Sequence, residues 1–169
     1  MKHKTEVRSS GFTLIEILIV VAIIGILSAG VLVGLGPVQR QGRDARRLAD
    51  LRSVQNALEL YFGKCTFYPG SYAAGGGCPA SFTPLTGTDA TIWQNLTQSI
   101  TQAGIGVTQV PNDPSAGRSY CYTSNDPGMS YVIGAKLEDA NNPALSRSVS
   151  GVVCGSLTCG TGGVYCVQL

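Results

Sequence analysis

The hydrophobic residues of the chain are concentrated near its start, in an almost unbroken run over residues 17–36. These twenty residues contain one polar side chain, Ser28. At about 1.5 Å per residue, a helix of this length covers about 30 Å, which matches the hydrocarbon core of a bilayer. A secretory signal peptide has a shorter apolar region of about 7 to 15 residues, and helices buried on every side are rare in a domain this small. The pattern predicts a transmembrane helix.

After Pro37 the pattern changes from continuous to periodic. Apolar residues recur at steps of three and four, as on one face of a helix, at Leu48, Leu51, Val54, Leu58, Tyr61 and Phe62. We expect the helix to continue in amphipathic form over residues 38–63 and to stop near Gly63. Its apolar face would pack against a domain formed by residues 64–169.

Residues 64–169 combine one helical pattern with several short strand-like runs. Residues 89–103 predict a helix with Asp89 as its N-cap and an apolar face of Ile92, Trp93, Leu96 and Ile100. Clusters of Gly, Asn, Asp and Pro separate the strand-like runs, as in an antiparallel meander; the runs lie at 119–123, 130–136, 150–154 and 163–167. The sequence predicts an α+β fold, with a long N-terminal helix packed on a small antiparallel β-sheet domain.

Six cysteines all lie after the apolar run: Cys65, Cys78, Cys121, Cys154, Cys159 and Cys166. An even number in a small glycine-rich domain indicates disulfides formed in an oxidising compartment. A zinc site needs paired short spacings, but the chain has no CxxC, and its one histidine, His3, lies in the N-terminal tail. We therefore expect no metal and no other cofactor.

The positions of the cysteines suggest three pairings among the fifteen connectivities that six cysteines allow. A bridge from Cys65 to Cys78 would tie a glycine-rich loop to the end of the long helix, where little apolar surface is buried. Cys154 and Cys159 flank four residues and would close a tight hairpin. Cys121 and Cys166 would then join strands that are distant in sequence.

Charged residues make up 13% of the chain, about half the share that is typical of soluble domains. Residues 1–11 hold three of the twelve basic and one of the ten acidic residues, so the rest of the chain has nine of each. This balance gives no reason to expect nucleic acid as a partner. Arginines shortly after the apolar run could form a nucleic-acid patch, but nearby acids at helical spacing favour ion pairs instead: Arg40 with Asp44, and Arg46 with Asp50.

The same arginines complicate the topology. Basic residues are more numerous after the apolar run than before it, which alone would place the cysteine-rich part in the cytoplasm. We give the cysteines more weight, because disulfides form outside the cytoplasm.

A short basic leader that ends at Gly11 is followed by "FTLIE" and then by the apolar run. This arrangement resembles the processing site of type IV prepilins and of the pseudopilins of type II secretion systems. A second, weaker resemblance lies in "VPNDPSAGRSYCYTSNDPGMSYVIGAKLE", where a DP turn precedes a Y-x-Y strand. The resemblance implies that a prepilin peptidase removes residues 1–11 by cutting after Gly11 and methylates Phe12. Residues 12–37 then remain as a membrane helix that becomes part of a filament core.

Glu16 lies at the start of the apolar run, where a carboxylate costs about 2.5 to 3.5 kcal/mol to insert into a membrane. Such a charge calls for a partner, and the resemblance implies that Glu16 pairs with the N-terminal amine of a neighbouring subunit during filament assembly. The alternative is that Glu16 reaches the membrane interface from near the helix end.

Small residues in the run favour close helix contacts: Gly25 with Ala29, and Gly30 with Gly34. The alternative is local flexibility, since glycine and proline weaken a helix. In the family a proline usually lies eight residues after the position of Gly25, but here that position is Val33 and Pro37 follows one turn later.

The chain carries no P-loop, no nucleotide-binding glycine motif and no nucleophile motif. We therefore predict that it is not an enzyme. Some members of the resembled family bind calcium, and the candidate oxygen ligands have no spacing typical of a calcium loop; they are Asp113, Asp126, Glu138, Asp139 and Asn141. We expect them to be solvated turn residues.

The predicted function is that of a structural subunit of a type IV filament, either a pilus or a secretion pseudopilus. Its expected partners are further copies of itself, a prepilin peptidase, an inner-membrane assembly platform with its ATPase, and membrane lipid before assembly. We expect it in the bacterial inner membrane, with its domain outside the cytoplasm. The alternative is a minor or tip subunit that binds DNA or an adhesion target.

Overall fold

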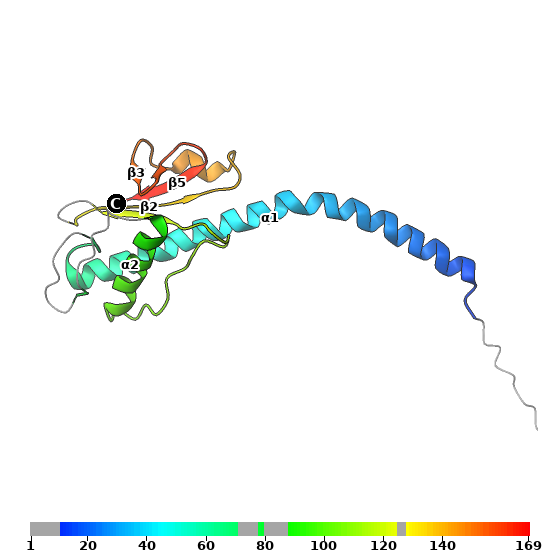
Figure 1. The fold of residues 1–169 in the computed structure, drawn as a ribbon, viewed down its shortest axis with the longest axis horizontal. Helices are drawn as coiled ribbons and strands as arrows, with labels where there is room; N and C mark the ends of the chain where they lie inside the picture. Colours follow the sequence, from blue (N-terminus) through cyan, green and yellow to red (C-terminus); the bar gives the residue numbers. More distant parts are fainter. Residues whose placement is uncertain (1–10, 71–77, 80–87, 125–127) are drawn as a thin grey trace, which may run out of the picture. The chain divides into compact units, whose positions relative to one another are not determined.

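The computed structural model describes residues 11–70, 78–79, 88–124 and 128–169, except for the side chains of residues 31–35. The chain divides into two compact units, one ending at Gln39 and the other running from Arg40 to Leu169. One helix, α1 (Leu14–Cys65), contributes to both (Figure 1). The leader, Asp126 and most of the glycine-rich loop before Cys78 lie outside the described residues.

The long helix α1 agrees with the predicted pattern. It contains Pro37 and ends at Cys65, two residues beyond the expected stop at Gly63, where Thr66 takes a positive φ of 64°. Within the described residues, no helix combines the length and hydropathy required of a membrane span.

The core of the second unit forms around the amphipathic part of α1, as predicted. Leu51, Val54, Leu58 and Tyr61 are at most 1% exposed and belong to one cluster with residues of α2 and of the sheet. Leu48 and Phe62 are half-buried at its margin.

The second helix, α2 (Asp89–Gln102), buries the expected face of Ile92, Trp93, Leu96 and Ile100. Its N-cap is Thr88 and not Asp89, so that prediction was wrong. Thr88 has extended backbone angles, and its hydroxyl accepts a hydrogen bond from the Thr91 N–H at 3.4 Å. The carboxylate of Asp89 instead accepts hydrogen bonds from the backbone N–H and the hydroxyl of Ser156.

The main sheet is antiparallel and has the strand order β1-β2-β5, formed by β1 (Cys121–Ser124), β2 (Tyr131–Lys136) and β5 (Val164–Gln168). The predicted α+β fold with a small antiparallel sheet is confirmed, but the run over residues 150–154 does not join this sheet, because the chain leaves it after β2. It forms a 3-10 helix, η1 (Pro143–Arg147), and a separate hairpin of β3 (Val153–Cys154) and β4 (Leu157–Thr158) before returning as β5. Neither η1 nor β4 was predicted.

Three disulfides stabilise the second unit. Cys65 and Cys78 are joined, as predicted, with their Cα atoms 5.9 Å apart. The other two predicted pairings were wrong, since Cys121 is bonded to Cys154 and Cys159 to Cys166.

The sheet register explains both corrections. Cys121 and Cys166 each lie opposite Gly134 of the central strand, from its two sides. Two strand spacings, roughly 9 to 10 Å, separate them, which is too far for a disulfide. In the β3–β4 hairpin, Cys154 lies opposite Leu157, so Cys159 is its diagonal neighbour and not its direct partner.

Gly134 makes room for both of the remaining bridges. A Cβ atom at this position would lie 2.6 Å from Sγ of Cys166 and 2.9 Å from Sγ of Cys121. The opposite face of β2, with Tyr131, Ile133 and Ala135, belongs to the core formed with α1 and α2. The sheet therefore has one face in the helix core and one face covered by disulfides.

Candidate functional site

The first unit presents an exposed apolar surface that starts at Phe12. Twelve large apolar side chains are between 51% and 85% exposed; they are Phe12, Leu14, Ile15, Ile17, Leu18, Ile19, Val20, Val21, Ile23, Ile24, Ile26 and Leu27. A surface of this extent is unusual for a monomer in water and marks a contact with lipid or with other protein chains.

Glu16, the one carboxylate within this surface, is bonded to the start of its own helix. The backbone N–H and the hydroxyl of Thr13 donate to Oε2 of Glu16 at 2.8 and 2.7 Å, and the Glu16 N–H approaches the Thr13 hydroxyl at 3.4 Å. Since α1 begins at Leu14, Thr13 is the N-cap and Glu16 is the third helical residue, which is the arrangement of a capping box. The sequence signature Thr-x-x-Glu was sufficient to predict this cap, but our sequence interpretation missed it.

The glycines of the apolar segment leave open space on the helix. A Cβ atom added at Gly25 or Gly30 would meet no other atom within 4 Å. These positions are free to be approached by another chain, while Val33 and Gly34 lie where the structure describes no side chains.

The comparisons agree with this N-terminal architecture. Residues 7–32 match the model of the prokaryotic N-terminal methylation motif. Over 54 residues the chain is 35% identical to the type II secretion system core protein G of Aeromonas hydrophila.

Both matches show that the N-terminal part of the chain is similar to proteins of the type IV pilin and pseudopilin family. The alignment covers 32% of this chain and 38% of the Aeromonas protein, so the likeness extends over about a third of each. No solved structure matches the chain. Proteins of this family are structural and not enzymatic.

The second unit of the chain contains a buried ionic cluster, formed by Arg43, Asp44, Arg47, Asp113 and Glu138. Arg47 lies at its centre with a fully buried side chain, and it donates to Asp113 at 2.9 and 3.0 Å, to Asp44 at 2.7 Å and to Glu138 at 3.0 Å. Arg43 donates to both oxygens of Glu138. The cluster therefore joins α1 to two loops that are distant in sequence.

The hydrogen bonds in this cluster shift its ionisation. Arg43, and then Arg47, lower the pKa of Glu138 from 4.5 to about 2, because both stabilise its charged form. Hydrogen bonding to Asp113, Asp44 and Glu138 raises the pKa of Arg47 above its usual range. Glu138 and the two guanidinium groups that bind it are therefore ionised around neutral pH.

This cluster corrects two of our sequence predictions. Asp44 binds Arg47 and the backbone N–H groups of Glu138 and Asp139, and not Arg40 as expected. Asp113 and Glu138 were expected in solvated turns, but they are 1% and 14% exposed. Contacts at sequence separations of 66 and 91 residues cannot be read from helical spacing.

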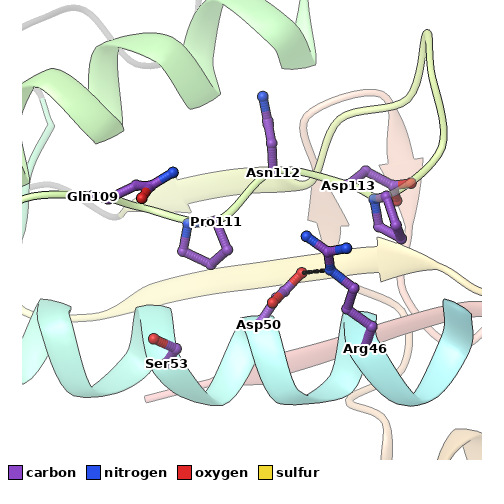
Figure 2. Close-up of a pocket in the computed structure, with 8 residues that line it drawn as sticks. Arg46, Asp50, Ser53, Gln109, Pro111, Asn112 and Asp113 are labelled. Carbon is purple, nitrogen blue, oxygen red and sulfur yellow. Dashed lines mark ion pairs between the residues drawn. The ribbon is translucent and has the colours of Figure 1, made fainter. Parts of the chain in front are cut away.

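The predicted pair of Arg46 and Asp50 is confirmed at 3.8 Å. It lies in an open groove of about 600 Å³ between α1 and the segment over residues 109–114 (Figure 2). Figure 2 shows Arg46, Asp50 and Ser53 on the helix and Gln109, Pro111 and Asn112 on the neighbouring segment, with the ring of Pro111 directed towards the helix. The lining is polar, and Asp50 also accepts a hydrogen bond from the Tyr120 hydroxyl at 2.7 Å.

The part of the chain that the structure describes contains no group of three or more His, Cys, Asp or Glu side chains that could hold a metal ion. Of the calcium candidates, Asp139 accepts a hydrogen bond from the Asn141 N–H at 2.9 Å, and Asp126 lies outside the described residues.

Proposed function

We propose that the chain is a structural subunit of a type IV filament, either a pilus or a secretion pseudopilus. A prepilin peptidase cuts after Gly11 and methylates Phe12. Residues 12–37 anchor the subunit in the inner membrane, with the second unit outside the cytoplasm. An assembly platform and its ATPase then build copies of the subunit into a filament. The exposed apolar surface that starts at Phe12 is the observation that carries this proposal, since lipid covers it before assembly and other subunits cover it afterwards.

Glu16 has a specific task in this scheme. Cleavage produces an ammonium group on Phe12, which is 85% exposed and lies shortly before the apolar run. A carboxylate and an ammonium group in an apolar environment stabilise each other strongly. Glu16 therefore pairs with the amine of a neighbouring subunit and sets the axial register of the filament. The capping box supplies hydrogen bonds to this carboxylate in the isolated subunit.

The deciding experiment replaces Glu16 by leucine in cells where this chain is the sole major subunit. Glu16→Leu inserts at least as well as the native chain, because the insertion penalty of the carboxylate is gone, but it yields no filaments in a shearing assay. Ile19→Leu, a similar-sized change one turn further along, serves as the matched control and assembles normally. Normal filament yield from Glu16→Leu would refute the pairing and favour the interface-reaching alternative.

Processing is tested separately by mass spectrometry of membrane fractions. The mature chain starts at methylated Phe12, and Gly11→Val leaves the leader attached because the larger side chain crowds the peptidase site. Ser10→Ala, one residue earlier, is the control that is still cleaved. A mature chain that begins at Met1 or beyond Gly30 would contradict the assignment.

A minor or tip subunit that binds DNA or an adhesion target is the second candidate, and the polar groove in Figure 2 is the observation that favours it. The number of copies per filament separates the two. A structural subunit makes up most of the sheared filament mass, whereas a tip subunit is present in a few copies.

A further inference from the structure

Exposed cations gather around the buried ionic cluster of the second unit. Four of them, Arg40, Arg46, Arg118 and Lys136, are exposed, and we call this set the basic collar. Arg46 precedes Arg47 directly. The Arg118 N–H donates to the Ser115 carbonyl at 3.2 Å, and the Ser115 hydroxyl accepts from Arg47 at 2.7 Å. Lys136 ends β2, two residues before Glu138.

Three acids in the same region are withdrawn from solvent, while Asp139 is half-buried and binds the Asn141 N–H. Asp44 and Asp113 are at most 1% exposed, and Glu138 is held by two arginines. Among the residues that the structure describes, Arg40, Arg118 and Lys136 have no ion-pair partner, and Arg46 has only the 3.8 Å contact with Asp50. Although the mature chain carries no net charge, the outermost charges of this region are therefore positive.

The collar is tied by the chain to the end of the apolar segment. Arg40 follows Pro37 by three residues, and even a fully extended chain keeps it within about 11 Å of that end. This distance is comparable with the Debye length of about 8 Å at physiological ionic strength. Anionic headgroups at a bilayer surface attract arginine and lysine over this range.

We propose that the basic collar docks onto the anionic headgroups of the bilayer that holds residues 12–37, before the subunit enters a filament. This inference rests on the membrane anchoring in the proposed function. Phosphate groups on lipids are the ligands, and each collar residue contributes about fivefold to the preference for anionic lipid, which corresponds to about 1 kcal/mol per charge near the surface. The basic residues after the apolar segment thus have a role outside the cytoplasm, although their number alone would place this part of the chain in the cytoplasm.

The test uses the full mature chain reconstituted in phosphatidylcholine bilayers. Electron paramagnetic resonance with trace spin-labelled lipids gives the association constant of phosphatidylglycerol relative to phosphatidylcholine at the protein boundary. We expect a ratio clearly above one that falls towards one in 1 M NaCl. Arg40→Gln lowers it, and the combined change Arg40→Gln, Arg46→Gln, Arg118→Gln and Lys136→Gln returns it to one.

Arg52→Gln is the matched control. Arg52 is an exposed arginine on the same helix, twelve residues after Arg40 and so about 18 Å further along, about two Debye lengths away. Arg52→Gln also removes one positive charge, but we expect it to leave the ratio of the association constants for phosphatidylglycerol and phosphatidylcholine unchanged. Thermal unfolding of each variant confirms that the second unit is still folded.

The possible failures differ from one another. A chain that inserts in both lipids with a ratio of one overturns the collar alone, whereas a chain that fails to insert into phosphatidylcholine overturns the anchoring and the collar together. The ratio could also respond to Arg40→Gln but not to Arg118→Gln and Lys136→Gln. Only residues of α1 would then bind the lipid, which would refute the basic collar as the site. The inference also fails if duplex DNA displaces the spin-labelled lipid, or if lipid preference appears only in assembled filaments.

Discussion

The apolar segment over residues 12–27 and the unit that begins at Arg40 differ in where their side chains find partners. In the segment, every large apolar side chain is more than half exposed. In the second unit, three disulfides and an ionic cluster close the structure, and no buried side-chain nitrogen or oxygen of the described residues lacks a hydrogen-bond partner. The apolar side chains of the first region are exposed in the single chain, whereas the buried polar groups of the second are paired within it. Substitutions should therefore affect assembly or domain stability, but seldom both.

The largest effect is expected at Arg47. Arg47→Met removes the buried cation and leaves the carboxylates of Asp44 and Asp113 uncompensated, which costs about 3 to 5 kcal/mol of unfolding free energy. Chemical denaturation of the variant measures this loss. Arg46→Met, next to it but 64% exposed, is the control, with a change within about 1 kcal/mol. Equal effects at the two positions would contradict the central role of Arg47.

The next largest effect concerns the bridge from Cys121 to Cys154. Replacing both cysteines by serine lowers stability by about 2 to 4 kcal/mol, because the unfolded chain regains the freedom of a long loop. The same change at Cys65 and Cys78 should cost about 0.8 kcal/mol less, since the loop lengths are 33 and 13 residues. Differential scanning calorimetry provides the comparison. Either variant still inserts in membranes if the two regions are independent; loss of insertion would contradict that independence.

A smaller effect is expected on acidification. The pKa of Glu138 is depressed from 4.5 to about 2, so its contribution to stability is present above pH 4.5 and is lost as the pH falls towards 2. Between pH 7 and pH 3 this group alone accounts for about 2 kcal/mol. Arg43→Gln removes the main cause of the shift and should make the stability profile shallower in this window. An unchanged profile would show that other carboxylates dominate acid unfolding.

The smallest effect on stability is expected at the helix start. Thr13→Val removes the capping hydroxyl, which costs about 1 kcal/mol and frays the first turn of α1. Amide hydrogen exchange in micelles should accelerate at Glu16 and Ile17, whose N–H groups are bonded to Thr13, whereas Thr13→Ser keeps the slow exchange. The unfolding temperature of the second unit stays the same. A lowered unfolding temperature would mean that the two regions are coupled.

The sequence was a good guide wherever contacts are local. The helical period of α1 and α2, the Cys65–Cys78 bridge and the pair of Arg46 with Asp50 all lie within short stretches of chain. The remaining disulfides and the Arg47 cluster depend on how strands and loops meet, which no spacing in one sequence reveals. Asp89 illustrates the difference, because its acidic character suggested a cap while the real partner, Ser156, lies 67 residues away.

Gly134 has a consequence for how the domain matures. It is the one residue of β2 without a Cβ, and the two sulfur atoms beside it leave no room for any other side chain. If β2 pairs one position out of place, the side chain of Ile133 or Ala135 enters this space and collides with the sulfur atoms of Cys121 and Cys166. The two bridges beside this strand therefore close without a steric clash only when β2 pairs in its native register. We expect oxidation to select chains with this pairing and to leave mispaired chains with free thiols.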